Sequence, residues 1–179
     1  MRSFPIVNEL HKLERRNTMP QKYVVCDPDK CLGCGICEFV CPAVKEKKID
    51  PSLSRIRGIN FEPAASMAIA CLLCERPLCV EACPRKALRK DENGIIRVDE
   101  DLCNGCHWCI SACNFGAIAW HPTKGVVMIC DLCDGEPECV KLCPFEALSL
   151  ATMEEAAHKF RKEAVEKLLR KPVAAAPES

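Results

Sequence analysis

Short apolar runs separated by turn-forming residues predict two β-hairpins and one further strand in this chain. Asn93-Gly94 lies between two such runs in "PRKALRKDENGIIRVDEDL", and Asn-Gly strongly favours a tight hairpin turn. The stretch "GAIAWHPTKGVVMIC" has a similar pattern, with a turn expected between Pro122 and Gly125. The apolar run in "KYVVCDPDK" predicts a strand that contains Cys26. We therefore expect short β-hairpins in the middle of the chain.

An amphipathic helix is predicted over residues 151–171. Its apolar positions recur at helical spacing: Ala157, Phe160, Ala164, Leu168 and Leu169. Thr152 and Glu155 form a candidate capping box at its start. Two interpretations stay open: the helix packs on its own domain, or it docks on a partner subunit. The segment "PIVNELHKLERR" predicts a weaker helix in an N-terminal extension, 1–22, and 172–179 is expected to be a flexible tail.

Composition limits the fold and the class of partner. The 179 residues are 49% apolar, but this share includes 17 cysteines, so metal or covalent staples are expected to hold the interior. Lys plus Arg equals Asp plus Glu at 25 each, so no global positive field favours nucleic acid. No run approaches the roughly 18 apolar residues of a membrane helix, and the N-terminus lacks the apolar core of a signal peptide. A cytoplasmic location with reduced thiols is therefore expected.

Sixteen of the cysteines fall into four groups of four. They are Cys31, Cys34, Cys37 and Cys41; Cys71, Cys74, Cys79 and Cys83; Cys103, Cys106, Cys109 and Cys113; and Cys130, Cys133, Cys139 and Cys143. Every group begins C-x2-C and ends C-x3-C. The first and third groups share C-x2-C-x2-C-x3-C, whereas the second and fourth share a longer middle with a proline two residues before the third cysteine. This alternation predicts an internal duplication.

Three kinds of cysteine chemistry compete to explain these groups. A disulfide framework suits a small exported chain, but this one shows no export signal and an odd number of cysteines. Structural zinc usually pairs two C-x2-C knuckles to close one tetrahedron, whereas each knuckle here is followed by a third and a fourth cysteine. The run C-x2-C-x2-C-x3-C is the bacterial ferredoxin pattern for 4Fe–4S clusters. Iron–sulfur ligation is therefore predicted, with structural zinc as the remote alternative.

The cysteine spacing suits clusters that are shared between segments. Three cysteines at intervals of three let a loop curl around one face of a cluster, and Gly33, Gly35 and Gly105 lie where that loop needs positive φ or a close approach. The fourth cysteine, placed at the start of a helical turn, is expected to bind a neighbouring cluster, as in two-cluster ferredoxins. Each group is therefore expected to contribute to two clusters.

The connections between groups predict which of them exchange their fourth cysteine. The Asn93-Gly94 hairpin lies between Cys83 and Cys103, and this order of cysteine, hairpin and cysteine is that of a ferredoxin core. The second and third groups are therefore expected to pair as an inner core over 71–113. The first and fourth groups, 31–41 and 130–143, are then left to pair around it. Pairing of the first group with the second and of the third with the fourth stays open.

These motifs resemble a known family, the four-cluster ferredoxin-like electron-transfer subunits of multi-subunit oxidoreductases. The similarity covers about residues 23–150 and lies in "CLGCGICEFVCP", "CLLCERPLCVEACP", "CNGCHWCISACNFGAI" and "CDLC…PECVKLCPFEAL", which follow the family's order. The resemblance implies an α+β fold: a duplicated bacterial-ferredoxin-like domain with short β-hairpins and helices around four 4Fe–4S clusters, plus terminal helices. With "SRIRGINFEP" between its first two groups, the chain looks most like the small subunit of tungsten-dependent aldehyde oxidoreductases.

The resemblance also implies ligand sets and partners. The sets are Cys31, Cys34, Cys37 and Cys143 for cluster 1; Cys130, Cys133, Cys139 and Cys41 for cluster 2; Cys71, Cys74, Cys79 and Cys113 for cluster 3; and Cys103, Cys106, Cys109 and Cys83 for cluster 4. The implied partners are a large catalytic subunit with a tungsten or molybdenum pterin and a flavin or other acceptor subunit.

Five residues near the motifs need separate interpretation. Cys26 is expected to be a buried core thiol and not a ligand. His107 and Trp108 are expected to pack over a cluster and limit its contact with solvent. His121 is expected to be an exposed turn residue. Asn114 stands where the other three groups have proline, and because it removes no ligand, all four clusters are expected to form.

The sequence carries no motif for catalysis. Ser–His–Asp, paired-carboxylate, H-E-x-x-H and phosphate-cradling glycine motifs are absent, so we expect that the chain is not an enzyme by itself. The leading hypothesis is an electron-transfer subunit that relays single electrons between a catalytic partner and an acceptor subunit or carrier. The alternative is a stand-alone polyferredoxin that self-associates through its terminal helices. A structural zinc protein is the remote hypothesis.

Overall fold

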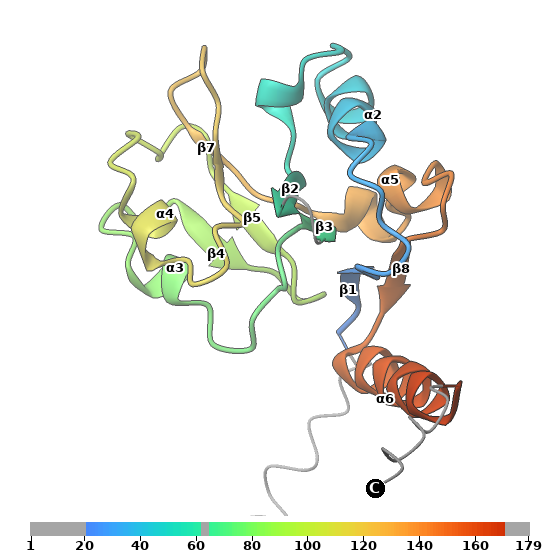
Figure 1. Ribbon diagram of the computed structural model, residues 1–179. Helices are drawn as coiled ribbons and strands as arrows, with labels where there is room; N and C mark the ends of the chain where they lie inside the picture. Colours follow the sequence, from blue (N-terminus) through green and yellow to red (C-terminus); the bar gives the residue numbers. More distant parts are fainter. Residues whose placement is uncertain (1–20, 62–64, 171–179) are drawn as a thin grey trace, which may run out of the picture.

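The computed structural model describes residues 21–61 and 65–170, and strands within this part pair as four two-stranded antiparallel sheets (Figure 1). The pairs are β1 (Tyr23–Cys26) with β8 (Leu148–Ala151), β2 (Arg57–Phe61) with β3 (Ala65–Ile69), β4 (Leu88–Lys90) with β5 (Ile96–Val98), and β6 (Ala119–Trp120) with β7 (Val127–Met128). The N-terminal helix and the tail expected from the sequence lie outside the described residues. Short antiparallel strands and small helices are the elements of a ferredoxin-type fold.

Four short helices each contain one or two of the grouped cysteines, and a longer helix follows them. The helices are α2 (Ile36–Lys45), α3 (Leu78–Glu81), α4 (Trp108–Ala112), α5 (Glu138–Lys141) and α6 (Met153–Arg170), with 3-10 turns η1 (Pro51–Leu53) and η2 (Leu132–Gly135). Each of α2 to α5 contains the third cysteine of a group. After α3, α4 and α5 the fourth cysteine follows the end of the helix, so the expectation that it starts a helical turn is wrong for these groups. Pro84 and Pro144 contribute, because a proline disfavours helical backbone at the residue before it.

Both predicted hairpins are confirmed. The β4–β5 turn is closed by the carboxylate of Asp91, whose Oδ1 accepts from the amides of Asn93 and Ile95 at 2.9 Å each. Gly94 has φ 76°, a conformation that glycine adopts without strain. The β6–β7 hairpin turns over residues 122–124, with the amide of His121 donating to the carbonyl of Val126 at 2.9 Å.

The strand pairing of two further sheets is not predicted from the sequence. The predicted strand β1 pairs with β8, with Tyr23 opposite Ala151 and Cys26 opposite Leu148, which brings the segment before the first cysteine group beside the segment after the fourth. The β2–β3 hairpin occupies what the sequence suggested only as a long connection. Figure 1 shows α2, α5, β1 and β8 on one side of the molecule and α3, α4, β4 and β5 on the other. Helix α2 accordingly contacts α5, and α3 contacts α4.

Helix α6 begins with the capping box that the sequence predicted. The carboxylate of Glu155 accepts from the amide of Thr152 at 2.8 Å, and the hydroxyl of Thr152 accepts from the amide of Glu155 at 3.2 Å. Thr152 and Ala156 are buried, whereas Leu168 and Leu169 are 70% and 80% exposed. Only the first turns of α6 pack closely on the described part of the domain, so the expected apolar stripe is not covered along its length. No helix in the described ranges is long and apolar enough to cross a membrane.

Candidate metal centres

Two cavities are each lined by four cysteines that come from two different groups. The first is lined by Cys31, Cys34, Cys37 and Cys143. The second is lined by Cys83, Cys103, Cys106 and Cys109. In both, three cysteines belong to one group and the remaining one is the fourth cysteine of another. These are the cysteines expected for clusters 1 and 4, and we call them sets 1 and 4.

Two further sets of four cysteines lie close enough for their charges to act on one another. Set 2 is Cys41, Cys130, Cys133 and Cys139, and set 3 is Cys71, Cys74, Cys79 and Cys113. The pKa of Cys71 is raised to about 11, mainly by burial, and the charges of the other three members of set 3 contribute to this rise. Burial also raises the pKa of Cys139, and the charges of the other three members of set 2 add to this effect. These effects show that Cys71 and Cys139 each lie near the other three members of their expected sets.

Helix packing brings the cysteine segments together, and one ion pair adds to this at set 2. Helix α2 packs on α5, and α3 packs on α4. Lys45, at the end of α2, lies 2.6 Å from the carboxylate of Asp131, which lies between Cys130 and Cys133. After burial and other groups, the charge of Cys71 in set 3 contributes to the raised pKa of Cys130 in set 2. This effect indicates that sets 2 and 3 are neighbours.

Backbone amides donate hydrogen bonds to several of these sulfurs. The amide of Ala87 donates to Sγ of Cys83 at 3.3 Å, and the amide of Ala117 donates to Sγ of Cys113 at 3.4 Å. In both cases the amide belongs to the residue four positions after the cysteine. Its hydrogen bond stabilises negative charge on the sulfur. Cys83 precedes a proline and Cys113 precedes Asn114, yet both sulfurs accept this bond. The local geometry therefore does not depend on the proline.

Glycines shape the cysteine loops as the sequence predicted. Gly33, Gly35 and Gly105 have φ of 67°, 72° and 69°, the left-handed region that favours glycine. A Cβ on Gly105 would lie 2.6 Å from Cη2 of Trp120 and 2.8 Å from the carbonyl oxygen of Gly125. The third cysteine loop therefore needs glycine at this position for both conformation and space.

Trp120, and not Trp108, packs on this loop. The rings of His107 and Trp120 meet edge to face, with centroids 4.4 Å apart, and His107 lines the cavity of set 4. Trp108 is 64% exposed, so the expectation that it limits solvent contact is wrong for the described chain. Trp120 from β6 fills the space beside Gly105 and His107 instead. The sequence could not place it there, because that contact depends on the fold of the β6–β7 hairpin.

His121 is buried, which corrects the expectation of an exposed turn residue. Its side chain is 4% exposed, and Nδ1 accepts from the amides of Thr123 and Lys124 at 3.3 and 3.2 Å. Nε2 lies 3.9 Å from a carboxylate oxygen of Glu46. The imidazole therefore closes its own turn from the inside, much as an aspartate does in an Asx-turn.

Cys26 is a buried thiol, as predicted. It is 8% exposed, and its Sγ accepts from the amide of Ala68 at 3.2 Å. Burial raises its pKa to about 11, and the neighbouring Cys31 and Cys143 have smaller effects. Because Cys31 and Cys143 both belong to set 1, Cys26 lies next to that set.

The spacing of the cysteine sulfurs suits a metal cluster better than a single metal ion. In a tetrahedral zinc site the Zn–S bonds of about 2.3 Å bring the sulfurs within about 4 Å of one another. Among the described residues, no three cysteine sulfurs lie within 4.8 Å of one another. Burial raises the pKa of Cys37 and Cys130 to about 12, which favours the neutral thiol, and a bound metal group would favour the thiolate instead. Thiolate donors, wide spacing and N–H···S bonds suit iron–sulfur clusters.

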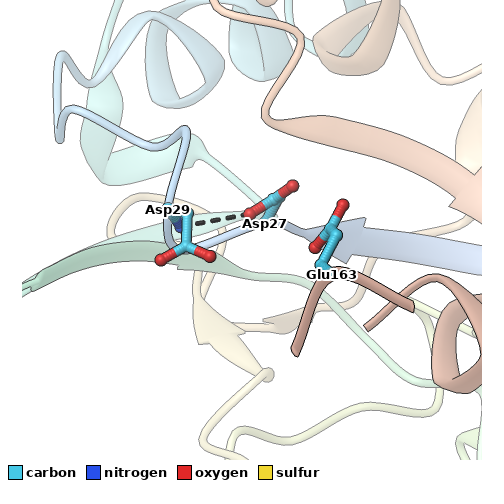
Figure 2. Close-up of side chains that lie close together, drawn as sticks. All are labelled: Asp27, Asp29 and Glu163. Atoms are coloured by element: carbon cyan, nitrogen blue, oxygen red, sulfur yellow. Dashed lines mark hydrogen bonds between the residues drawn. The ribbon is translucent and has the colours of Figure 1, made fainter. Parts of the chain in front are cut away.

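One carboxylate group was not anticipated from the sequence. Asp27, Asp29 and Glu163 bring ligand-type oxygens within 4.8 Å of one another, as Figure 2 shows. Lysines neutralise them: Lys159 lies 3.2 Å from Asp27 and 3.9 Å from Glu163, and Lys167 pairs with Asp29. The group therefore fastens α6 to the loop after β1 through ion pairs.

Comparison with known families matches a 4Fe–4S dicluster domain twice, over residues 27–87 and over residues 64–153. The second match alone spans half of the chain. The chain belongs to the 4Fe–4S dicluster domain family. Iron–sulfur chemistry is thereby favoured over the disulfide and zinc alternatives, in agreement with the donor set.

Three named relatives are similar to this chain. The B subunit of the anaerobic dimethyl sulfoxide reductase of Escherichia coli is 35% identical over 117 residues, which cover 58% of this chain and 57% of that protein. The aliphatic sulfonate oxidoreductase, polyferredoxin-like subunit, of Pyrococcus furiosus is 39% identical over 110 residues, 60% and 63% of the two chains. The thiosulfate reductase electron transfer subunit PhsB of Salmonella typhi is 33% identical over 124 residues, 64% of each chain. The chain thus spans less than two thirds of each relative.

Proposed function

We propose that this chain is an electron-transfer subunit that holds four 4Fe–4S clusters and relays single electrons between a catalytic oxidoreductase subunit and an acceptor. The observation that carries the proposal is that two cavities are each lined by four cysteines drawn from two different groups. The proposed ligands of clusters 1 to 4 are sets 1 to 4. Membership of the dicluster family and the names of the relatives support this assignment.

The proposed relay follows the order of sets 1, 2, 3 and 4. Helix α2 carries Cys37 of set 1 and Cys41 of set 2 one turn apart, which keeps these two sets adjacent. Contact between α3 and α4 does the same for sets 3 and 4, and the neighbours Cys71 and Cys130 link the two halves. The clusters supply one-electron redox chemistry when bound, while the chain fixes their spacing and excludes water.

The two ends of the proposed relay are accessible to partners. Cys34 of set 1 and Cys106 of set 4 are exposed, whereas none of the eight cysteines of sets 2 and 3 is exposed, and three of them, Cys71, Cys130 and Cys139, are buried. Apolar side chains flank both ends, with Leu32 65% and Trp108 64% exposed. Such side chains beside a redox centre suit docking of a partner subunit. We propose that electrons enter at one end and leave at the other.

The proposed partner is a large catalytic subunit with a tungsten or molybdenum pterin, and the narrower assignment is a tungsten-dependent aldehyde oxidoreductase. Support comes from the resemblance of the cysteine motifs and from relatives named as parts of reductases. Catalysis then takes place in the partner and not in this chain. A flavin or other subunit accepts the electrons, and the complex is cytoplasmic. We also propose that 23–150 arose by duplication of a ferredoxin domain.

Anaerobic purification from the native cell tests this function. The chain should co-purify with a large metal–pterin subunit, and reductive titration of the chain should consume about four electrons, one per cluster. Isolation of the chain alone, with its full iron content, would instead favour the polyferredoxin alternative. The name polyferredoxin-like subunit, carried by one relative, is the observation that keeps that alternative in view.

A further inference from the structure

Arg55 is a mostly buried cation whose backbone contacts a cysteine of set 2. It lies between η1 and β2, and its amide donates to Sγ of Cys41 at 3.3 Å. Its neighbours Ser54 and Ile56 are 0% and 1% exposed. The hydroxyl of Ser54 donates to the carbonyl of Ile56 and accepts from the amide of the same residue. The backbone that carries Arg55 is therefore held firmly beside Cys41.

The guanidinium of Arg55 has one ion-pair partner and one unsatisfied nitrogen. Its Nη2 lies 3.0 Å from Oε1 of Glu46, and the Arg55 side chain is 16% exposed. Its Nη1 is buried and has no hydrogen-bond partner among the described residues. A buried guanidinium nitrogen needs an acceptor, and the sulfur atoms of an iron–sulfur cluster are acceptors.

The charge of Arg55 also acts on the other half of set 2. Burial opposes ionisation of Asp131, but Lys45 and, more weakly, Arg55 hold the pKa of Asp131 below its usual range. Asp131 lies between Cys130 and Cys133 in the sequence. Arg55 is thus close to both segments that supply set 2.

Glu46 neutralises Arg55 only in part. The same carboxylate lies 3.9 Å from Nε2 of His121 and 3.8 Å from Nζ of Lys124. Lys45 is engaged by Asp131. Lys124 also lies 3.1 Å from the carboxylate of Glu100, its nearer partner. The Glu46 carboxylate is therefore shared, with Arg55 as its nearest cation.

We propose that Arg55 raises the reduction potential of the cluster bound through Cys41, and that Glu46 moderates this effect. The inference rests on the proposed function, because it needs clusters in place. Reduction adds one negative charge to a cluster, and a fixed cation in a poorly solvated site stabilises the reduced form. Arg55 is accordingly a positioning and tuning residue, and not a ligand.

A pair of opposite charge changes tests the proposal. Potentials are measured on the full chain with clusters loaded anaerobically, by redox titration followed by electron paramagnetic resonance. The relevant signal is the one that Cys41→Ser alters. Arg55→Gln should shift that potential downward, Glu46→Gln should shift it upward, and the other signals should stay in place. Arg161→Gln, an exposed arginine on α6, is the matched control and should shift none.

The two variants separate electrostatics from structure, because both break the same ion pair. A merely structural role predicts shifts in one direction for both, and that result, or no shift in either, overturns the proposal. If Arg55→Gln holds less iron than wild type, the potentials of Glu46→Gln and Arg55→Lys test the proposal in its place. Arg55→Lys should keep the potential near that of wild type, and an unshifted or lowered potential in Glu46→Gln overturns the inference. A wild-type chain without iron and sulfide would instead refute the proposed function.

Discussion

Nζ of Lys45 lies 2.6 Å from Oδ2 of Asp131, which joins the end of α2 to the start of η2 across 86 positions of the sequence. The two side chains are 17% and 21% exposed, so the pair is largely shielded from solvent. It fastens the first cysteine group to the fourth. Together with the β1–β8 sheet, it explains why the ends of the described domain meet.

Lys45→Met should loosen set 2. The change leaves a largely buried carboxylate without its main partner, at a cost between that of an exposed and of a fully buried pair, about 1–3 kcal/mol. Iron release to a chelator under anaerobic conditions should be faster than in wild type. Lys141→Met removes a more exposed pair with Glu136 and Glu138 and should leave the rate unchanged. Equal rates for both variants would contradict this role.

The Lys45–Asp131 pair should be insensitive to pH near neutrality. Although burial opposes its ionisation, hydrogen bonding and charge from Lys45 hold the pKa of Asp131 below its usual range. A lowered carboxyl pKa gives stability that is present above the ordinary value of about 3.9 and is lost as pH falls through the lowered value. The ratio of iron-release rates for Lys45→Met and wild type should therefore stay constant from about pH 6 to about pH 9. A ratio that falls to one within this window would rule the explanation out.

Gly105→Ala should reduce cluster binding more than Gly116→Ala. Both glycines have positive φ, 69° and 60°, so each alanine meets backbone strain of about 1–2 kcal/mol. Only at Gly105 does the added Cβ also meet Trp120 and a backbone oxygen, whereas nothing lies within 4 Å of it at Gly116. Iron per chain after anaerobic reconstitution measures the difference. Similar losses in the two variants would show that crowding by Trp120 is unimportant.

Asn114→Pro should be tolerated. Cys113 has ψ 108°, an extended conformation that suits the residue before a proline. The amide of Ala117 still reaches Sγ of Cys113 in the present turn. We expect full iron content and a stability that is unchanged or higher by about 0.4–1 kcal/mol, because proline restricts the unfolded chain. Loss of iron in this variant would mean that Asn114 is needed for a reason other than the turn.

Thr152→Ala should fray the start of α6. The hydroxyl of Thr152 caps the amide of Glu155, and loss of such a cap costs about 1 kcal/mol. Hydrogen exchange should speed up in the first turn of α6 while the β4–β5 hairpin stays protected. Unchanged exchange in α6 would show that the ion pairs of Lys159 and Lys167 alone hold the helix.

Local features of this fold were predictable from the sequence, and long-range ones were not. Asn93-Gly94, the glycines of the cysteine loops and the Thr152–Glu155 capping box each act within a few residues, so their spacing is informative. The β1–β8 pairing and the packing of Trp120 on Gly105 join segments far apart or depend on a folded hairpin. The sequence does not indicate the burial of His121 because its turn looks polar, and the contacts of Glu46 with its cations become visible only in three dimensions.

Cysteine substitutions should separate the sixteen grouped cysteines from Cys26. Cys34→Ser removes a proposed ligand of cluster 1 and should cost up to about four iron atoms per chain. Cys26→Ser keeps a small side chain that can accept from the amide of Ala68 and should retain all iron. Iron loss in Cys26→Ser matching that in Cys34→Ser would make Cys26 a ligand.

Iron and acid-labile sulfide per chain, measured on anaerobically purified wild-type protein, test the central claim most directly. Four 4Fe–4S clusters predict about sixteen of each. About twelve of each, with the thiol of Cys113 open to alkylation, would contradict the four-cluster assignment. Zinc in place of iron, without sulfide, would contradict the whole account.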